Sequence, residues 1–254
     1  MMTRLPIYLL CMVLILAVIL AGLGWQEAHD AWPTNEDKTL IKAVLYYESW
    51  LMPFLLPLVV MGFRRKHVSL GMTVFSVIGL VLGIYARFVE PNLLFVKQTQ
   101  INTGYSLKLA LISDMHYGLY STPQQMQRLV AKLNSLNVDA IVVAGDWTYE
   151  PSKKISLTEQ LKPFSQLKYP IYSVPGNHDE EMPGPPLAKE LKAALIANNI
   201  KPIEGQGIDL GKVRLVGVGD LLAFEARAER LAALSIQDKP LLLLTHNPDS
   251  LDEL

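Results

Sequence analysis

Three long runs of apolar residues occupy the first third of the chain, and they predict membrane-spanning helices at about 5–25, 43–63 and 68–86. Each run is close to the roughly 20 residues that a helix needs to cross a bilayer. The first run is longer than the apolar core of a cleaved signal peptide, so a retained helix is favoured over a signal peptide. Residues 1–90 are therefore predicted to form a transmembrane region, followed by a linker over 91–105.

The second apolar run differs from the other two because it contains Glu48, Pro53 and Pro57. Prolines are tolerated in membrane helices when neighbouring groups satisfy the freed carbonyls. Glu48 is either a functional acid inside the membrane or a residue at headgroup level, and its place near the end of the run favours headgroup level.

From residue 106 the pattern changes to short apolar runs that alternate with stretches of helical periodicity. The expected strands are Leu107–Ile112, Ala140–Ala144, Ile171–Val174, Val213–Val218 and Leu241–Leu244. The expected helices are Gln124–Leu136 behind a Thr122-Pro123 start, Leu157–Leu167 interrupted by Pro163, Leu187–Asn198, and Glu225–Leu234. Strands that alternate with helices predict an α/β domain over 106–254, with helices on the faces of a sheet.

Charge supports this division, because 13 of the first 90 residues are charged against 34 of the remaining 164. The net charge of −1 excludes a strongly basic protein that binds nucleic acid. The single cysteine, Cys11, lies in the first apolar run, so the sequence excludes a disulfide framework and a cysteine metal site.

The loops between the apolar runs carry opposite charges and predict an orientation. Arg64-Arg65-Lys66 lies between the second and third runs, whereas the charged residues of 26–39 are four acids and one lysine. The positive-inside rule places the N-terminus and residues 64–67 in the cytoplasm, so 106–254 is expected on the extracytoplasmic face of the plasma (inner) membrane. Arg87, at the outer end of the third run, argues against this orientation. Residues 106–254 would lie on the cytoplasmic face if the second run does not cross the membrane.

A polar cluster follows each of four expected strands. The clusters contain Asp114 and His116, then Asp146, then Asn177 and His178, and finally His246. The first three clusters are spaced by 32 and 31 residues, close to the roughly 30 residues of a strand–helix–strand unit. Parallel strands would bring these side chains to one edge of the sheet, where ligands bind in open α/β folds.

Carboxylate, carboxamide and imidazole groups together suit two divalent or trivalent metal ions, with Mn, Fe and Zn all compatible. A pair of such ions is the apparatus for hydrolysing phosphate esters, and a His that is not a ligand can protonate the leaving oxygen. Taken singly, the residues have ordinary explanations: Asp114 as a helix cap, and Asp146 or Asn177 as turn residues. Their order, each at the end of a strand, is the specific signal. Tyr117, Trp147 and Tyr149 flank the motifs and would either contact a substrate or fill space over the sheet edge.

These motifs resemble the calcineurin-like metallophosphoesterases over about residues 106–254, and more closely a membrane-anchored bacterial branch of that family. The resemblance implies a layered α-β-β-α sandwich. It also implies that Asp114 and His116 bind one metal, that Asp146 bridges both, and that Asn177 and His246 bind the second. His178 would act without being a ligand, by stabilising the transition state and protonating the leaving oxygen while metal-bound hydroxide attacks phosphorus. Asp179 would support these groups from behind.

The same resemblance leads one to expect a Gly-His-x-His motif after His246, and the sequence ends at Leu254 without one. We therefore expect either a domain that is incomplete at its C-terminal end or an impaired form. The leading hypothesis is a membrane-anchored phosphohydrolase acting on a phosphate ester or pyrophosphate, for which tethering favours a lipid-linked substrate. The alternative is a membrane-anchored binding protein without enzymatic activity.

Overall fold

The computed structural model describes residues 5–33, 35–102, 104–179, 187–218 and 239–251, and the chain divides into two compact units. One unit contains Met1–His29 and Glu36–Phe95, and the other contains Asp30–Asn35 and Val96–Leu254. The short segment Asp30–Asn35 therefore belongs to the second unit although it lies between two helices of the first.

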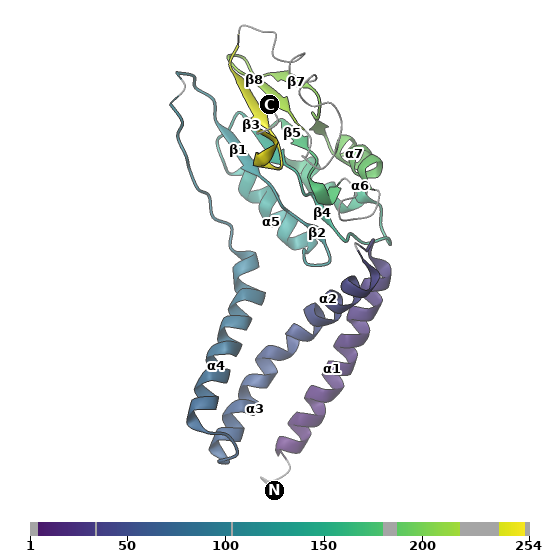
Figure 1. The fold of residues 1–254 in the computed structure, drawn as a ribbon, viewed down its shortest axis with the longest axis vertical. Coiled ribbons are helices and arrows are strands. Elements are labelled where there is room, and N and C mark those ends of the chain that lie inside the picture. The colour runs from purple at the N-terminus through teal and green to yellow at the C-terminus, as the bar shows by residue number, and fades with distance from the viewer. Residues whose placement is uncertain (1–4, 34, 103, 180–186, 219–238, 252–254) are drawn as a thin grey trace. The chain divides into compact units, whose positions relative to one another are not determined.

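The first unit is helical (Figure 1). Its elements are α1 (Leu5–Asp30), α2 (Glu36–Glu48), η1 (Ser49–Leu51), α3 (Met52–Arg64), α4 (Leu70–Ile84), the π-helical turn η2 (Tyr85–Val89) and η3 (Glu90–Asn92). The 3₁₀ turn η1 precedes Pro53, which has no N–H to donate to the carbonyl of Ser49. That carbonyl accepts from the N–H of Met52 instead.

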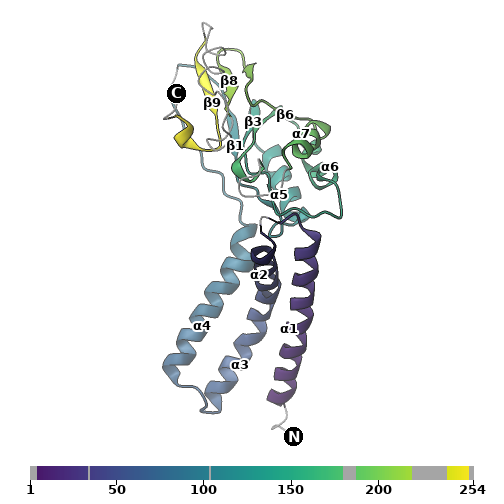
Figure 2. The ribbon, with the colours of Figure 1, turned by 45° about the vertical axis from the view of Figure 1, so that its right-hand side comes forward.

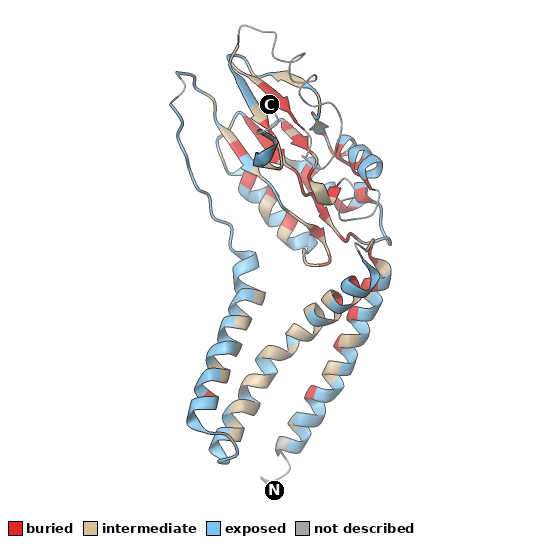
Figure 3. Cartoon of the chain, in the orientation of Figure 1, coloured by how far each residue is buried: buried red, intermediate tan, exposed pale blue. Residues whose placement is uncertain are grey.

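Three helical stretches are long and apolar enough to cross a membrane: Ile7–Asp30, Glu36–Arg64 and Leu70–Asn92. Large apolar side chains along them are exposed, including Val18, Phe75 and Leu82 (Figure 3). Exposed apolar surface of this extent is costly in water and favourable in lipid. The predicted three apolar helices near the N-terminus are confirmed.

The second unit is built on a four-stranded sheet with the order β1-β3-β5-β6. These strands are β1 (Leu109–Ile112), β3 (Ala140–Ala144), β5 (Ile171–Val174) and β6 (Ile200–Pro202), and all neighbouring pairs are parallel. Because the strands are parallel, their carboxyl ends share one edge of the sheet.

Helices cover one face of this sheet. They are α5 (Pro123–Asn134), α6 (Leu157–Gln160), η4 (Lys162–Gln166) and α7 (Ala188–Ala197). Ile141 and Val143 of β3 pack in one core cluster with residues of all of these helical segments, such as Val130, Phe164 and Leu191.

The other face of the sheet packs against a second sheet with the order β7-β8-β9, from Gly207–Asp209, Arg214–Gly217 and Leu241–Leu244 (Figure 2). Strands β7 and β8 are antiparallel, and β8 and β9 are parallel. Val142 and Val174 of the first sheet contact Leu215 and Leu244 of the second in a separate core cluster. Alternate residues of β3 thus face opposite cores, as expected for a strand buried on both sides.

The predicted α/β class with a parallel sheet is confirmed, and most element bounds agree closely. Helix α5 starts as predicted, with the Thr122 side chain accepting from the N–H of Gln125 in a capping box. The expected helix Leu157–Leu167 is divided into α6 and η4, because Pro163 cannot continue an α-helix. The expected helix Glu225–Leu234 lies outside the described residues.

Candidate metal centre

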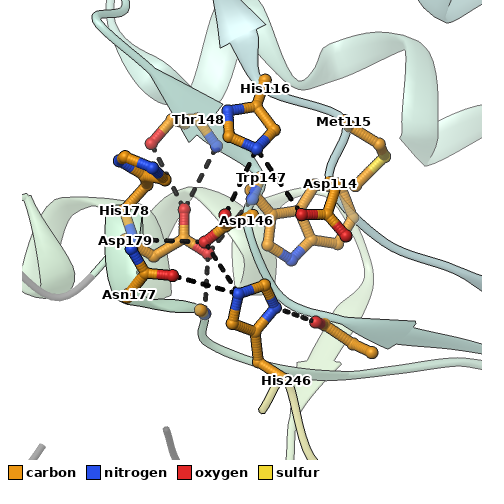
Figure 4. Close-up of polar contacts among 12 residues, drawn as sticks. Asp114, Met115, His116, Asp146, Trp147, Thr148, Asn177, His178, Asp179 and His246 are labelled. Atoms are coloured by element: carbon orange, nitrogen blue, oxygen red, sulfur yellow. Dashed lines mark hydrogen bonds and ion pairs between the residues drawn. The ribbon is translucent and has the colours of Figure 1, made fainter. Parts of the chain in front are cut away.

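The structure brings all six candidate side chains to the carboxyl ends of the strands (Figure 4). Asp114 and His116 follow β1, and Asp146 follows β3. Asn177 and His178 lie in the turn η5 (Asn177–Asp179) after β5. His246 follows β9, so the centre draws on both sheets.

Asp146 is the central residue of the cluster. Its side chain is 3% exposed, and its Oδ2 lies 3.2 Å from Nε2 of His116. Its Oδ1 accepts the backbone N–H of His178 at 3.1 Å and lies 3.6 Å from Nε2 of His246. Asp114 is at the rim, with a side chain that is 56% exposed and an Oδ1 3.6 Å from Nε2 of His116.

Two groups of potential ligand atoms share Asp146. One group is His116, Asp146 and His178, and the other is Asp114, Asp146 and His246; within each group the atoms lie within 4.8 Å of one another. A carboxylate common to two groups is what a bridging ligand requires. The grouping differs from the resemblance in two respects: Asp114 groups with His246 and not with His116, and the imidazole of His178, expected to be no ligand, belongs to the group of His116 and Asp146.

Left-handed backbone conformations aim these side chains. The φ angles of Asp114, His116 and Asp146 are 53°, 44° and 55°, a region that non-glycine residues rarely adopt. Backbone bonds hold the two loops side by side: the N–H of Asp114 donates to the Gly145 carbonyl, and that of His116 to the Asp146 carbonyl, both at 3.1 Å. Unfavourable conformations of this kind cluster at functional sites, where surrounding contacts enforce them.

Two glycines allow the loops after β3 and β5 to touch. A Cβ on Gly176 would lie 2.2 Å from Oδ1 of Asp146, and a Cβ on Gly145 would lie 2.5 Å from the Gly176 nitrogen. Gly145 also has a φ of 83°. Any side chain at either position would push Asp146 away from the backbone of His178.

The buried carboxylate of Asp179 fastens the same two loops from behind. It accepts backbone N–H bonds from Gly176, Trp147 and Thr148, each at 3.1 Å. Burial raises the pKa of Asp179 to about 6, although these three N–H bonds act to lower it. The side chain thus ties the residues that follow Asp146 to those that precede Asn177.

The atoms that surround Nε2 of His246 suit a metal ion. Its Nδ1 is 2.7 Å from the Ala144 carbonyl, so the neutral ring carries its proton there and presents the lone pair of Nε2. That lone pair faces Oδ1 of Asn177 at 3.1 Å and Oδ1 of Asp146 at 3.6 Å. These three hydrogen-bond acceptors converge with no hydrogen between them, and a cation stabilises such an arrangement. A backbone carbonyl that fixes the His tautomer is the usual support for a metal ligand.

Electrostatics within the cluster favour an ionised Asp146. Burial acts to raise the pKa of Asp146, but the hydrogen bond from His116, the positive charge that His246 carries when protonated and the backbone N–H bond from His178 lower it overall. The hydrogen bond with Asp146 raises the pKa of His116 against the opposing effect of burial.

The flanking aromatic residues separate into two kinds. Trp147 and Tyr117 are buried in the core, and the Trp147 Nε1–H donates to the Ser173 hydroxyl at 2.7 Å. Tyr149 is instead at the site: its ring centroid lies 4.8 Å from that of His178 and 5.3 Å from that of His116. Tyr120, which the sequence pattern did not single out, stacks on Tyr149.

Comparison with known proteins adds a family and several relatives. A family model described as calcineurin-like phosphoesterase matches residues 107–252. An uncharacterized metallophosphoesterase of Helicobacter pylori is 26% identical over 182 residues, covering 68% of this chain and 47% of its own length. A transmembrane protein with a metallophosphoesterase domain from Danio rerio is 33% identical over 122 residues, covering 46% of this chain and 27% of its own.

A further relative is the UDP-2,3-diacylglucosamine pyrophosphatase LpxG of Chlamydia trachomatis, 29% identical over 127 residues, which cover 46% of this chain and 38% of the relative. The chain spans about half the length of the first curated relatives it matches.

Proposed function

This chain belongs to the calcineurin-like phosphoesterase family, and we propose that it hydrolyses a phosphate ester or pyrophosphate with the help of two metal ions. The observation that carries the proposal is the shared carboxylate of Asp146, which is buried and within reach of two sets of ligand atoms. A site for one metal ion would not need such a residue at its centre.

The proposed roles follow from the positions of the side chains. Asp114, His116, Asp146, Asn177 and His246 would hold the ions, with Asp146 common to both. Bound there, the metals would supply Lewis-acid stabilisation of phosphoryl oxygens and activate water as the nucleophile. His178 would donate a proton from its imidazole to the leaving oxygen, because its backbone is fixed by the N–H bond to Asp146.

A lipid-linked substrate is the proposed substrate class. Three helices suited to the membrane raise the local concentration of substrates that are themselves membrane-bound. The similarity to a protein named as a UDP-2,3-diacylglucosamine pyrophosphatase supports a pyrophosphate bond in a lipid precursor as one such substrate.

The proposed location of the centre is the extracytoplasmic face of the inner membrane, from the basic residues Arg64, Arg65 and Lys66. Single cysteines test this in a Cys11→Ser background. A membrane-impermeant maleimide added to intact cells should label Lys132→Cys on the exposed face of α5 and should not label Lys66→Cys. The reverse pattern would refute the orientation and leave the chemistry untouched.

Metal analysis and hydrolysis of bis(p-nitrophenyl) phosphate by the purified full chain test the chemistry. We expect bound Mn, Fe or Zn, activity that a chelator abolishes, and at least a tenfold loss on His178→Ala or Asp146→Asn. Asp209→Asn, at an exposed carboxylate in β7, is the matched control and should keep full activity. Bound metal without hydrolysis of phosphomonoesters, phosphodiesters or pyrophosphates would favour the alternative of a binding protein.

A further inference from the structure

The segment between the first two membrane helices is part of the unit that contains the metal-centre residues. Asp30–Asn35 clusters with Val96–Leu254 and not with the helices on either side of it. Nothing in its composition indicates this, because Asp30-Ala31-Trp32-Pro33 has the appearance of an ordinary connecting loop.

Backbone hydrogen bonds attach this segment to residues 151–153. The N–H of Trp32 donates to the Pro151 carbonyl at 2.8 Å, and the N–H of Lys153 donates to the Asp30 carbonyl at 2.6 Å. Ala31 and Ser152 form an antiparallel bridge between these two bonds, and Ala31 is buried. The segment therefore pairs with 151–153 in the manner of a short added strand.

Side chains reinforce the pairing. Trp32 packs against the core cluster that lies between the four-stranded sheet and its helices. Lys153 places its ammonium 5.4 Å from the centroid of the Trp32 ring, and Lys154 forms an ion pair with Asp30. Cation–π and ion-pair contacts add to apolar burial, so three kinds of interaction act on the same few residues.

Residues 151–153, which pair with this segment, continue directly from the loop that follows β3 and carries Asp146, which we call the metal loop. Asp146 is followed by β4 (Thr148–Tyr149), which pairs with β2 (Tyr117–Gly118), and then by the buried Glu150 and Pro151. Asp146 and Glu150 both have left-handed φ angles, 55° and 51°. A stretch with such conformations at both ends keeps its path only while the contacts on either side hold it.

The pairing of β4 with β2 holds the middle of the stretch, and further contacts hold its two ends. Asp179 binds the N–H groups of Trp147 and Thr148 near Asp146. The Asp30–Trp32 segment binds Pro151 and Lys153 at the far end. We infer that Asp30–Trp32 is a positioning segment for the metal loop, which keeps Asp146 and Tyr149 in place by fixing the end of the stretch that carries them. Its effect on turnover depends on the proposed function, whereas its effect on the loop does not.

Exchange of backbone amide hydrogens in the purified full chain, freed of metal, tests the effect on the loop. Trp32→Ala should speed exchange over residues 147–153 at least tenfold and leave 141–143 of β3 unchanged. Trp32→Phe, which keeps an aromatic ring, should restore most of the protection. Trp25→Ala is the matched control, because Trp25 is an exposed residue of α1 in the other unit. Equal exchange in Trp32→Ala and Trp25→Ala would overturn the inference.

A cross-link tests the docking itself. In the antiparallel bridge, Ala31 and Ser152 form a pair without mutual hydrogen bonds, for which the Cα atoms are typically about 4.5 Å apart, within the range of a disulfide. In a Cys11→Ser background, Ala31→Cys with Ser152→Cys should cross-link on mild oxidation. Failure to cross-link in the folded protein would contradict the docking.

The same cross-link connects the docking to turnover. Trp32→Ala should lower kcat for bis(p-nitrophenyl) phosphate about fivefold with KM within twofold. The disulfide formed by Ala31→Cys and Ser152→Cys should restore kcat in that background. If the parent chain shows no hydrolysis at all, the proposed function fails, while exchange and cross-linking still decide the positioning role. Hydrolysis that Trp32→Ala leaves unchanged, together with faster exchange, would remove the segment's link to catalysis.

Discussion

Asp114 and Asp146 carry the same functional group at the ends of neighbouring parallel strands, yet their surroundings differ sharply. The Asp114 side chain is mostly exposed and belongs to one ligand group, whereas that of Asp146 is almost fully buried and belongs to two. The backbone around Asp146 is also held by the close approach of Gly176 and by the bonds of Asp179. Burial and confinement, and not residue type, therefore distinguish the central candidate ligand, Asp146, from the peripheral one, Asp114.

Removing one charge from each aspartate gives the largest expected contrast. Asp146→Asn should lower kcat/KM about 10³-fold, equivalent to ~4 kcal/mol, because both proposed metal ions lose a shared ligand. Asp114→Asn should cost about tenfold, the usual order for weakening a less confined ligand. Activity and metal content of the two purified variants measure the difference, and equal losses would remove the distinction between them.

Filling the space behind Asp146 should be the next largest effect. A Cβ at Gly176 would stand 2.2 Å from Oδ1 of Asp146, so Gly176→Ala should lower the free energy of unfolding by ~2–3 kcal/mol. Gly79→Ala, within α4 and with open space around its Cβ position, is the control and should be neutral or slightly stabilising. Chemical denaturation measures the free energy of unfolding of both variants. An unchanged value for Gly176→Ala would show that the loops can separate without cost.

Asp179→Asn should destabilise the fold by ~2 kcal/mol, because an NH2 group replaces one of the two carboxylate oxygens and cannot accept from the buried N–H groups that face it. Asp139→Asn is the comparison, since Asp139 accepts a single N–H, that of Lys108, at an exposed position. Its cost should stay below ~1 kcal/mol. A larger loss at Asp139 than at Asp179 would contradict the role assigned to burial.

The smallest effect is expected at Tyr149, whose ring contacts both His116 and His178. Tyr149→Leu should lower kcat roughly fivefold by releasing the His178 imidazole, whereas Tyr149→Phe should stay close to the parent. Steady-state kinetics of the two variants measure this, with metal content checked in each. A loss in Tyr149→Phe as large as in Tyr149→Leu would assign the effect to the hydroxyl.

Much of the second unit was predictable because its strands are short apolar runs, several of which end in a polar cluster. The strands β3, β5 and β9 have the predicted bounds, and the first three polar clusters converge as their spacings of 32 and 31 residues indicated. Each strand–helix–strand unit carries its own local signal of this kind, whereas the approach of His246 from the second sheet has no such spacing behind it.

Other features depend on contacts that no local pattern encodes. The two-residue strands β2 and β4 are too short for alternation to be visible. The left-handed conformations of Asp114, His116 and Asp146 are imposed by bonds between separate loops. Ala31 and Ser152, which pair with each other, lie 121 positions apart in loops whose composition gives no sign of the pairing.

The position of His246 has a thermodynamic consequence. This residue extends from the strand β9 of one sheet and contacts the Ala144 carbonyl and the Asn177 side chain at the edge of the other. A cation held among these residues would therefore also link the two sheets, and its binding free energy would add to the stability of the sandwich. The melting temperature of the second unit would then report the free metal concentration, rising with each tenfold increase above the dissociation constant.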